Sequence, residues 1–183
     1  MQTFNLSANI ENGFAKGMQY IVTPNAQNVV NNLINGFKTG IHSYTIIGTY
    51  GTGKSSFLLA LEADLDKKNR SKYLLNPKLL SECTEFEILN IVGDYADLSV
   101  LLGRKLNMEG ASNSVLDELK AYYQRLAKEN KFLLLVIDEF GKVLEHAAKN
   151  NPEQELYFLQ KLAEFVNCLL YTSPSPRDGL LSR

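Results

Sequence analysis

The sequence is poor in cysteine, in net charge and in long apolar runs, and each shortage argues against a class of protein. The two cysteines, Cys83 and Cys168, lie far apart without metal-ligand spacing, which argues against a disulfide scaffold or a zinc site. The 19 basic and 20 acidic residues nearly cancel, so no overall positive field attracts nucleic acid as a partner. The longest apolar run, residues 132–137, is too short to cross a bilayer.

The length and the N-terminus place the chain among cytoplasmic globular proteins. Its 183 residues, 45% of them apolar, suffice for one domain with a real core and are too few for two. The first residues, MQTFNLSANIENGFAKG, have no apolar core after a basic start, so no secretory signal is predicted. We therefore expect a cytoplasmic protein without a membrane partner.

The last sixteen residues, CLLYTSPSPRDGLLSR, do not continue the helical pattern before them. The string resembles the translation of a transposase-based sequencing adaptor. A segment of that origin would not be part of the protein's own fold. We expect the natural segment to be residues 1–167, cut short at that point, with 168–183 as a non-native tail. The alternative is a genuine linker rich in proline and serine.

Hydrophobic periodicity predicts helices and strands in alternation. The pair Thr23-Pro24 is typical of a helix start, and apolar spacing supports a helix to about Phe37. Further helices are predicted from Lys54 to about residue 65 and over 98–106, 114–129 and 153–167, with strands over 43–47, 86–92 and 132–137. The last strand is apolar on both alternating faces, which is typical of a parallel sheet covered on both sides. The order implies a layered α/β fold.

The helix that begins at Lys54 is expected to bury one face only. Phe57, Leu58, Leu61 and Leu65 share that face, whereas the acidic residues Glu62 and Asp64 fall mostly on the other side.

The stretch GTYGTGKS, residues 48–55, is the strongest chemical signal in the chain. Glycines permit positive φ and close approach of the backbone to phosphate, and successive N–H groups at a helix N-terminus favour an anion. Lys54 would reach the β- and γ-phosphates, and the Ser55 hydroxyl would bind magnesium. The alternative is a glycine-rich turn followed by an incidental Lys-Ser. The predicted nucleotide-binding residues are Gly48, Thr49, Tyr50, Gly51, Thr52, Gly53, Lys54, Ser55 and Ser56.

An acidic pair, Asp138 and Glu139, directly follows the apolar strand. In open α/β sheets, ligands bind beyond the carboxyl ends of the strands, so both carboxylates are expected near the phosphate loop. Asp138 would hold magnesium, and Glu139 would activate the attacking water with Lys54 as its catalytic partner on the phosphate. The alternative is that the pair only caps the next helix and neutralises its dipole.

Together, GTYGTGKS and FLLLVIDEF resemble the Walker A and Walker B motifs of P-loop ATPases with a catalytic glutamate, the class that includes the AAA+ ATPases. The resemblance covers about residues 41–140 and implies a three-layer P-loop NTPase core with a parallel sheet, truncated at its C-terminal side. It divides the chain into an N-terminal lead-in with a helix (1–40), a partial ATPase domain (41–167) and the tail (168–183).

The resemblance also implies a strand order of 5-1-4-3-2 in the sheet. Strand four would lie between residues 43–47 and 132–137 and would come later than both along the chain. We therefore expect this segment to fold poorly alone, because those two strands have no neighbour between them.

The resemblance implies that the chain binds ATP with Mg²⁺ and, in its full-length parent, hydrolyses ATP. The surrounding sequence looks like the N-terminal ATPase module of large bacterial proteins, several of which act in DNA processing or anti-phage defence. Further domains of the same chain and a second copy are the partners this implies. The sensor residue and the arginine finger of the family have no assignable position before residue 167.

Two other functions fit the same residues. Asp138 to Gly141 also matches the Asp-x-x-Gly element of GTPases, although no Asn-Lys-x-Asp guanine-reading element is present. Alternatively, the module is a switch or scaffold that binds ATP to lock domains together and turns it over little.

Overall fold

The computed structural model describes residues 10–12, 20–66, 73–76, 85–108 and 114–168. The N-terminal region forms a short 3₁₀ turn, η1 (Ile10–Asn12), and two helices, α1 (Pro24–Lys38) and α2 (Lys54–Leu65). Strand β1 (Glu85–Val92) and helices α3 (Leu98–Lys105) and α4 (Val115–Lys128) follow. Strand β2 (Lys131–Asp138) leads to α5 (Phe140–Lys149) and α6 (Pro152–Cys168). None of the described helices is long and apolar enough to span a membrane.

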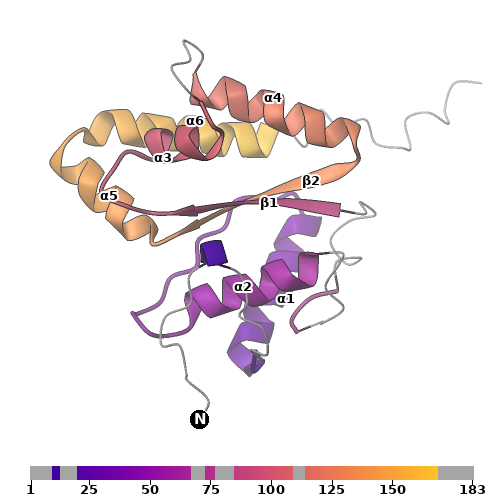
Figure 1. Cartoon of the computed structure of the whole chain (residues 1–183). Coiled ribbons are helices and arrows are strands. Elements are labelled where there is room, and N and C mark those ends of the chain that lie inside the picture. Colours follow the sequence, from indigo (N-terminus) through magenta and orange to yellow (C-terminus); the bar gives the residue numbers. More distant parts are fainter. Residues whose placement is uncertain (1–9, 13–19, 67–72, 77–84, 109–113, 169–183) are drawn as a thin grey trace, which may run out of the picture.

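The two strands pair in parallel and form the sheet of a mixed α/β fold. Their register runs from Glu85 opposite Lys131 to Val92 opposite Asp138. Helices α1 and α2 lie on one side of the sheet, and α3, α4 and α6 lie on the other (Figure 1). Both faces are therefore covered, as the doubly apolar pattern of residues 132–137 predicts.

Side chains alternate between the two faces along each strand. On the α2 face, Leu134 and Val136 pack in one cluster with Ile88, Leu59 and Ile10. On the opposite face, a larger cluster joins both strands to α3, α4, α5 and α6; its most deeply buried members are Leu98, Leu102, Leu119 and Val143. Two apolar layers thus flank the sheet, one on each face.

The predicted helices and two of the three predicted strands agree with the structure to within about two residues. The Thr23 hydroxyl accepts a hydrogen bond from the Ala26 N–H at 3.2 Å, and Pro24 is the first residue of α1, as the helix-start pattern indicates. Helix α5 was not assigned from the apolar pattern, although Val143 and Ala147 are buried at helical spacing. The predicted adaptor-derived tail lies outside the described residues from 169 onward.

The prediction of a strand over residues 43–47 is wrong. Residues 41–49 form no strand, and the sheet in the described part of the chain contains β1 and β2 alone. Ile47 is 90% exposed, and the Tyr44 hydroxyl donates to the carbonyl of Ile41 at 2.6 Å. A strand needs a neighbour to take its N–H and C=O groups, so β-prone composition alone leaves this segment unpaired.

The prediction that α2 buries a single face is also wrong. Leu59 packs toward the sheet, whereas Phe57 and Ala60 pack against Val30 and Ile34 of α1. Asp64, expected at the surface, is only 4% exposed. Helix α2 is therefore enclosed between α1 and the sheet, which holds the residues that follow the glycine loop in place.

The buried carboxylate of Asp64 binds three consecutive backbone N–H groups. Its Oδ1 accepts from Tyr73 at 2.7 Å, and its Oδ2 accepts from Leu74 at 2.6 Å and Leu75 at 2.7 Å. These bonds attach residues 73–75 to the end of α2. A buried charge is tolerated here because several donors replace the water that it loses.

We expect Asp64→Ala to destabilise the fold by about 3–5 kcal/mol, because buried donors left unpaired cost about 1–3 kcal/mol each. For a chain of this size, that corresponds to a fall in Tm of about 10 °C. Thermal unfolding followed by circular dichroism measures it. Glu118→Ala is the control, because Glu118 is only partly buried and pairs with the exposed Arg125 at 3.6 Å. Equal Tm values for the two variants would contradict the role of Asp64.

A second buried carboxylate, Glu155, joins α6 to the start of α3. Its Oε1 accepts from the Leu98 N–H at 3.0 Å, and its residue is 3% exposed. His146 Nδ1 lies 3.3 Å from Asp97 Oδ1 at the same junction, too poorly aligned for a hydrogen bond. Burial raises the pKa of Glu155, the Leu98 N–H lowers it, and among the charges Asp97 raises it while His146 lowers it.

This raised pKa predicts a dependence of stability on pH. The folded state holds the Glu155 proton more tightly than the unfolded chain, so the contribution is full below the ordinary pKa of 4.5 and is lost as pH rises through the higher folded value. Glu155→Gln keeps an acceptor for Leu98 and removes the buried charge. We expect the Tm of the variant to rise relative to the Tm of the wild type as the pH increases from 4 to neutrality. A constant Tm difference over that range would rule the effect out.

Candidate nucleotide site

Two of the three glycines in the loop between residues 48 and 53 have a positive φ, the conformation that glycine permits. Gly51 and Gly53 have φ of +79° and +83°, which a side chain would oppose. Gly48 is not among the residues with positive φ, so that part of the prediction is wrong for it. A Cβ at Gly48 would instead lie 3.0 Å from the Thr52 hydroxyl, so glycine is favoured there by close packing inside the loop.

The Lys54 ammonium lies inside this loop. Its Nζ donates to the carbonyl oxygens of Gly48 and Thr49, each at 2.8 Å, and Thr52 Oγ1 donates to the same Thr49 oxygen at 2.8 Å. The loop is exposed, and Tyr50 at its tip is 97% exposed. The positive charge is therefore held where the loop N–H groups and the N-terminus of α2 meet solvent.

Helix α2 turns Ser55 toward the sheet. Leu59, one turn after Ser55, packs on the face of the sheet that carries Val136. Residues four apart on a helix share a face, so Ser55 and Leu59 lie in one row, with Ser55 nearer the loop. Ser55 and Ser56 are half-buried in the first turn of α2.

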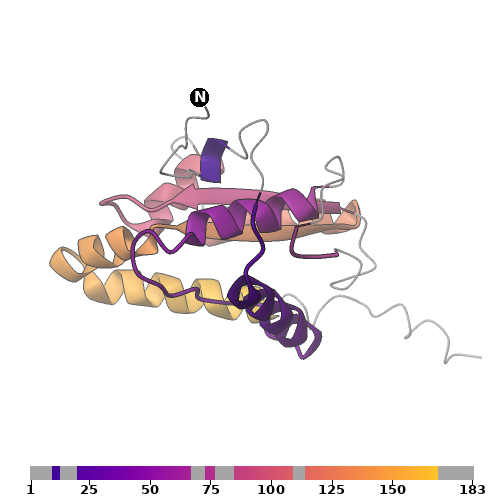
Figure 2. The ribbon, with the colours of Figure 1, turned by 90° about the horizontal axis from the view of Figure 1, so that it is seen from below.

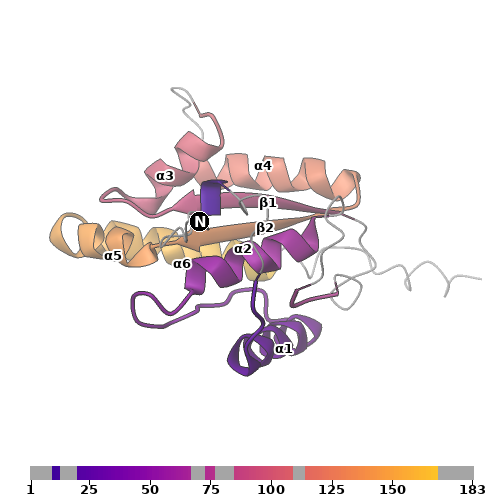
Figure 3. The ribbon, with the colours of Figure 1, turned by 60° about the horizontal axis from the view of Figure 1, so that its bottom comes forward.

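The carboxyl ends of β1 and β2 and the N-terminal end of α2 point to the same end of the molecule. Figures 1, 2 and 3 agree on this arrangement, with the 41–53 segment curving past that end before it enters α2. Asp138 is the last residue of β2 and, by alternation, lies on the same face as Leu134 and Val136, which is the α2 face. The glycine loop and the acidic pair are thus brought to one edge of the fold.

The backbone around Asp138 is tightly packed. The Gly93 N–H donates to the Asp138 carbonyl at 2.8 Å, and a Cβ at Gly93 would clash with the carbonyl of Glu139. Asp138 Oδ1 accepts from the Glu139 N–H at 2.9 Å. Gly93 is therefore required for β1 and the turn after β2 to approach each other, which orients the Asp138 carboxylate.

Glu139 occupies a strained and exposed position. It has φ of +52°, a left-handed conformation that costs a non-glycine residue on the order of 1 kcal/mol. It is the N-cap residue of α5, yet its side chain makes no capping hydrogen bond and instead pairs with Lys142. The Glu139 side chain therefore does not cap α5 by a hydrogen bond, and its carboxylate pairs instead with a lysine one turn along the helix.

The sequence interpretation missed Glu62 and Asn90, which lie beside this edge. Asn90 Nδ2 donates to Glu62 Oε2 at 2.9 Å and to the Ile10 carbonyl at 3.2 Å. Burial raises the pKa of Glu62, the Asn90 bond lowers it, and the charge of Asp138 raises it. An isolated acidic residue in α2 gave no signal of this position, because its partner Asn90 comes 28 residues later.

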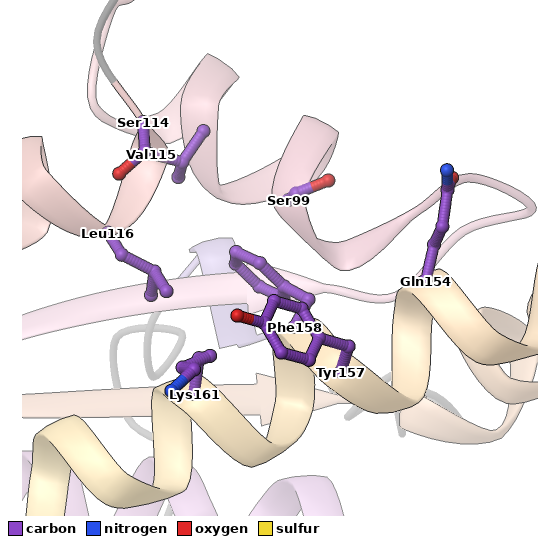
Figure 4. A pocket seen from close by; sticks show the side chains of 8 residues that line it. All are labelled: Ser99, Ser114, Val115, Leu116, Gln154, Tyr157, Phe158 and Lys161. Atoms are coloured by element: carbon purple, nitrogen blue, oxygen red, sulfur yellow. The ribbon is translucent and has the colours of Figure 1, made fainter.

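A shallow, open pocket of about 370 Å³ lies elsewhere, between α3, α4 and α6 on the opposite side of the sheet from α2 (Figure 4). Phe158 and Tyr157 of α6 lie against Leu116 of α4, so the lining is mainly apolar. Its lysine, Lys161, pairs with Glu164 at 3.1 Å. None of the predicted nucleotide or metal residues lines this pocket, and its apolar walls do not suit a triphosphate.

Comparisons with family models, with curated proteins and with solved structures find no match for this chain. Within the described residues, no group of three or more His, Cys, Asp or Glu side chains could hold a metal ion by itself.

Proposed function

We propose that the chain is a P-loop ATPase module of the AAA+-like class that binds ATP with Mg²⁺ through the glycine loop and the acidic pair. The observation that carries the proposal is the position of Lys54. Its ammonium lies within a loop whose Gly51 and Gly53 have positive φ, directly before a helix without a side-chain cap. This combination presents N–H groups and a cation to an anion at one place.

The roles follow from the chemistry of each group. The N–H groups of the loop and of the first turn of α2 would bind the phosphates, and Lys54 would exchange its carbonyl partners for phosphate oxygens. Ser55 and Asp138 would supply oxygen ligands to magnesium. Mg²⁺ accepts a hydroxyl and one carboxylate together with water and phosphate oxygens, so the lack of a three-residue metal cluster in the described chain fits this ion.

The bound ion would neutralise the charge of the phosphates, and the protein would orient them. Glu139, one residue beyond Asp138, would accept the proton of the attacking water in the full-length parent. Its side chain would first have to leave Lys142.

Binding of a fluorescent ATP analogue to the full chain tests the proposal. We expect saturable binding that strengthens with Mg²⁺ and that ATP displaces more effectively than GTP. Preferred displacement by GTP would favour the GTPase interpretation of Asp138 to Gly141. Absence of any saturable binding with Mg²⁺ present would contradict a nucleotide site.

A second candidate is an ATP-gated switch with little turnover, and one observation favours it. Glu139 is paired with Lys142 in a left-handed conformation, so the proposed base is engaged away from the phosphate loop. In such a switch, ATP would hold neighbouring domains together without being consumed. The turnover of a Glu139 variant separates the two candidates.

A further inference from the structure

The polar cluster beneath α2 contains more acceptors than donors. Asn90 Nδ2 serves both Glu62 Oε2 and the Ile10 carbonyl. Glu62 Oε1 and Asn90 Oδ1 are buried atoms that receive no hydrogen bond from the part of the chain that the structure describes. Buried acceptors without donors leave a surplus of negative potential in a region of low dielectric.

This cluster lies close to Asp138. Asn90 is opposite Val136 in the register, and Asp138 follows Val136 on the same face, two residues or about 6.6 Å along the strand. The charge of Asp138 also contributes to raising the pKa of Glu62, in agreement with that placement.

The same face of α2 links the cluster to the phosphate loop. Ser55 and Glu62 are seven residues apart, two helical turns, so both face the sheet on either side of Leu59. Ser55, Asp138 and Glu62 therefore surround one region between the start of α2 and the end of β2.

We propose that Glu62, held in place by Asn90, is a positioning residue whose negative charge raises the affinity of the site for its divalent cation without ligating it. The inference rests on the proposed function, because it assigns a role to a group behind the proposed ligands Ser55 and Asp138. Without a cation, the carboxylates of Glu62 and Asp138 repel each other. A divalent cation at Asp138 removes that repulsion and is attracted by both charges.

The test is the Mg²⁺ dependence of binding of a fluorescent ATP analogue to the full chain at pH 8, above the range in which carboxylates ordinarily titrate. Glu62→Gln keeps an acceptor for Asn90 and removes the charge. We expect the Mg²⁺ midpoint to rise on the order of tenfold, as expected for the loss of a nearby charge. Affinity for the analogue in EDTA should not fall, because without the cation the charge of Glu62 can only repel the anionic phosphates.

Three further variants serve as controls for a merely structural or non-specific effect. Glu62→Asp keeps the charge and should keep a near-normal midpoint, whereas Glu62→Met, neutral and of similar size, should shift it as Glu62→Gln does. Glu164→Gln removes a carboxylate from the surface of α6 and should leave the midpoint unchanged. A wild-type midpoint in well-folded Glu62→Gln would overturn this inference alone. Binding by the wild type that ignores Mg²⁺, or no binding, would overturn the proposed function with it.

Discussion

Lys54→Ala should abolish measurable ATP binding, with a loss of affinity of about 100-fold or more. A charge-assisted contact to phosphate contributes about 1.5–3 kcal/mol, and the ammonium also holds the loop through the carbonyls of Gly48 and Thr49. The variant loses both contributions at once. Isothermal titration with ATP and Mg²⁺ measures the effect.

The control for this change is Lys120→Ala, which removes the same charge from an exposed position in α4. It changes the net charge of the chain by the same amount as Lys54→Ala does. We expect it to bind ATP as the wild type does. Similar losses in the two variants would mean that general electrostatics, rather than the loop, holds the nucleotide. Retained ATP binding by Lys54→Ala, with an unchanged Tm, would show that the loop around Lys54 does not hold the nucleotide.

Glu139→Gln should lower the rate of ATP hydrolysis about 100-fold or more, the usual contribution of a positioned general base. The amide keeps the size of the side chain but cannot accept the proton of water. Affinity for ATP should change little, because Glu139 is expected to contact the attacking water and not the phosphates. Turnover of the intact polypeptide that carries this module, together with ATP binding by both forms, measures the two quantities.

Lys142→Ala is the companion variant, because it frees Glu139 without altering it. If the pair with Lys142 only holds Glu139 away from the attacking water, the rate of ATP hydrolysis by Lys142→Ala should equal or exceed that of the wild type. An unchanged rate in Glu139→Gln would exclude a catalytic role for Glu139 and would favour the ATP-gated switch.

The local signals in the sequence were sufficient for most helices and for the glycine loop. The Thr23-Pro24 start of α1 and the continuous apolar run of residues 132–137 are signals carried by neighbours within a few positions, and such neighbours determine local backbone structure. The glycines at 51 and 53 likewise report a backbone requirement that is local.

Features that depend on distant partners could not be predicted in this way. Residues 43–47 are β-prone, but a strand forms only where another strand can pair with it, and none of the described residues does so. From its neighbours in the sequence, Asp64 resembles a surface residue. The backbone N–H groups that bind its carboxylate belong to residues 73–75, further along the chain. Glu62 similarly acquires its environment from Asn90 and Asp138, which lie on strands far along the chain.

We infer that the loop ending at Ser55 and the carboxylates of Asp138 and Glu139 converge on one triphosphate and its metal. An experimental structure of the full chain with Mg²⁺ and a non-hydrolysable ATP analogue tests this convergence. We expect the β- and γ-phosphates to lie inside the loop against Lys54, with Ser55 and Asp138 beside the ion. An analogue bound in the apolar pocket between α3, α4 and α6, or a metal far from Asp138, would contradict it.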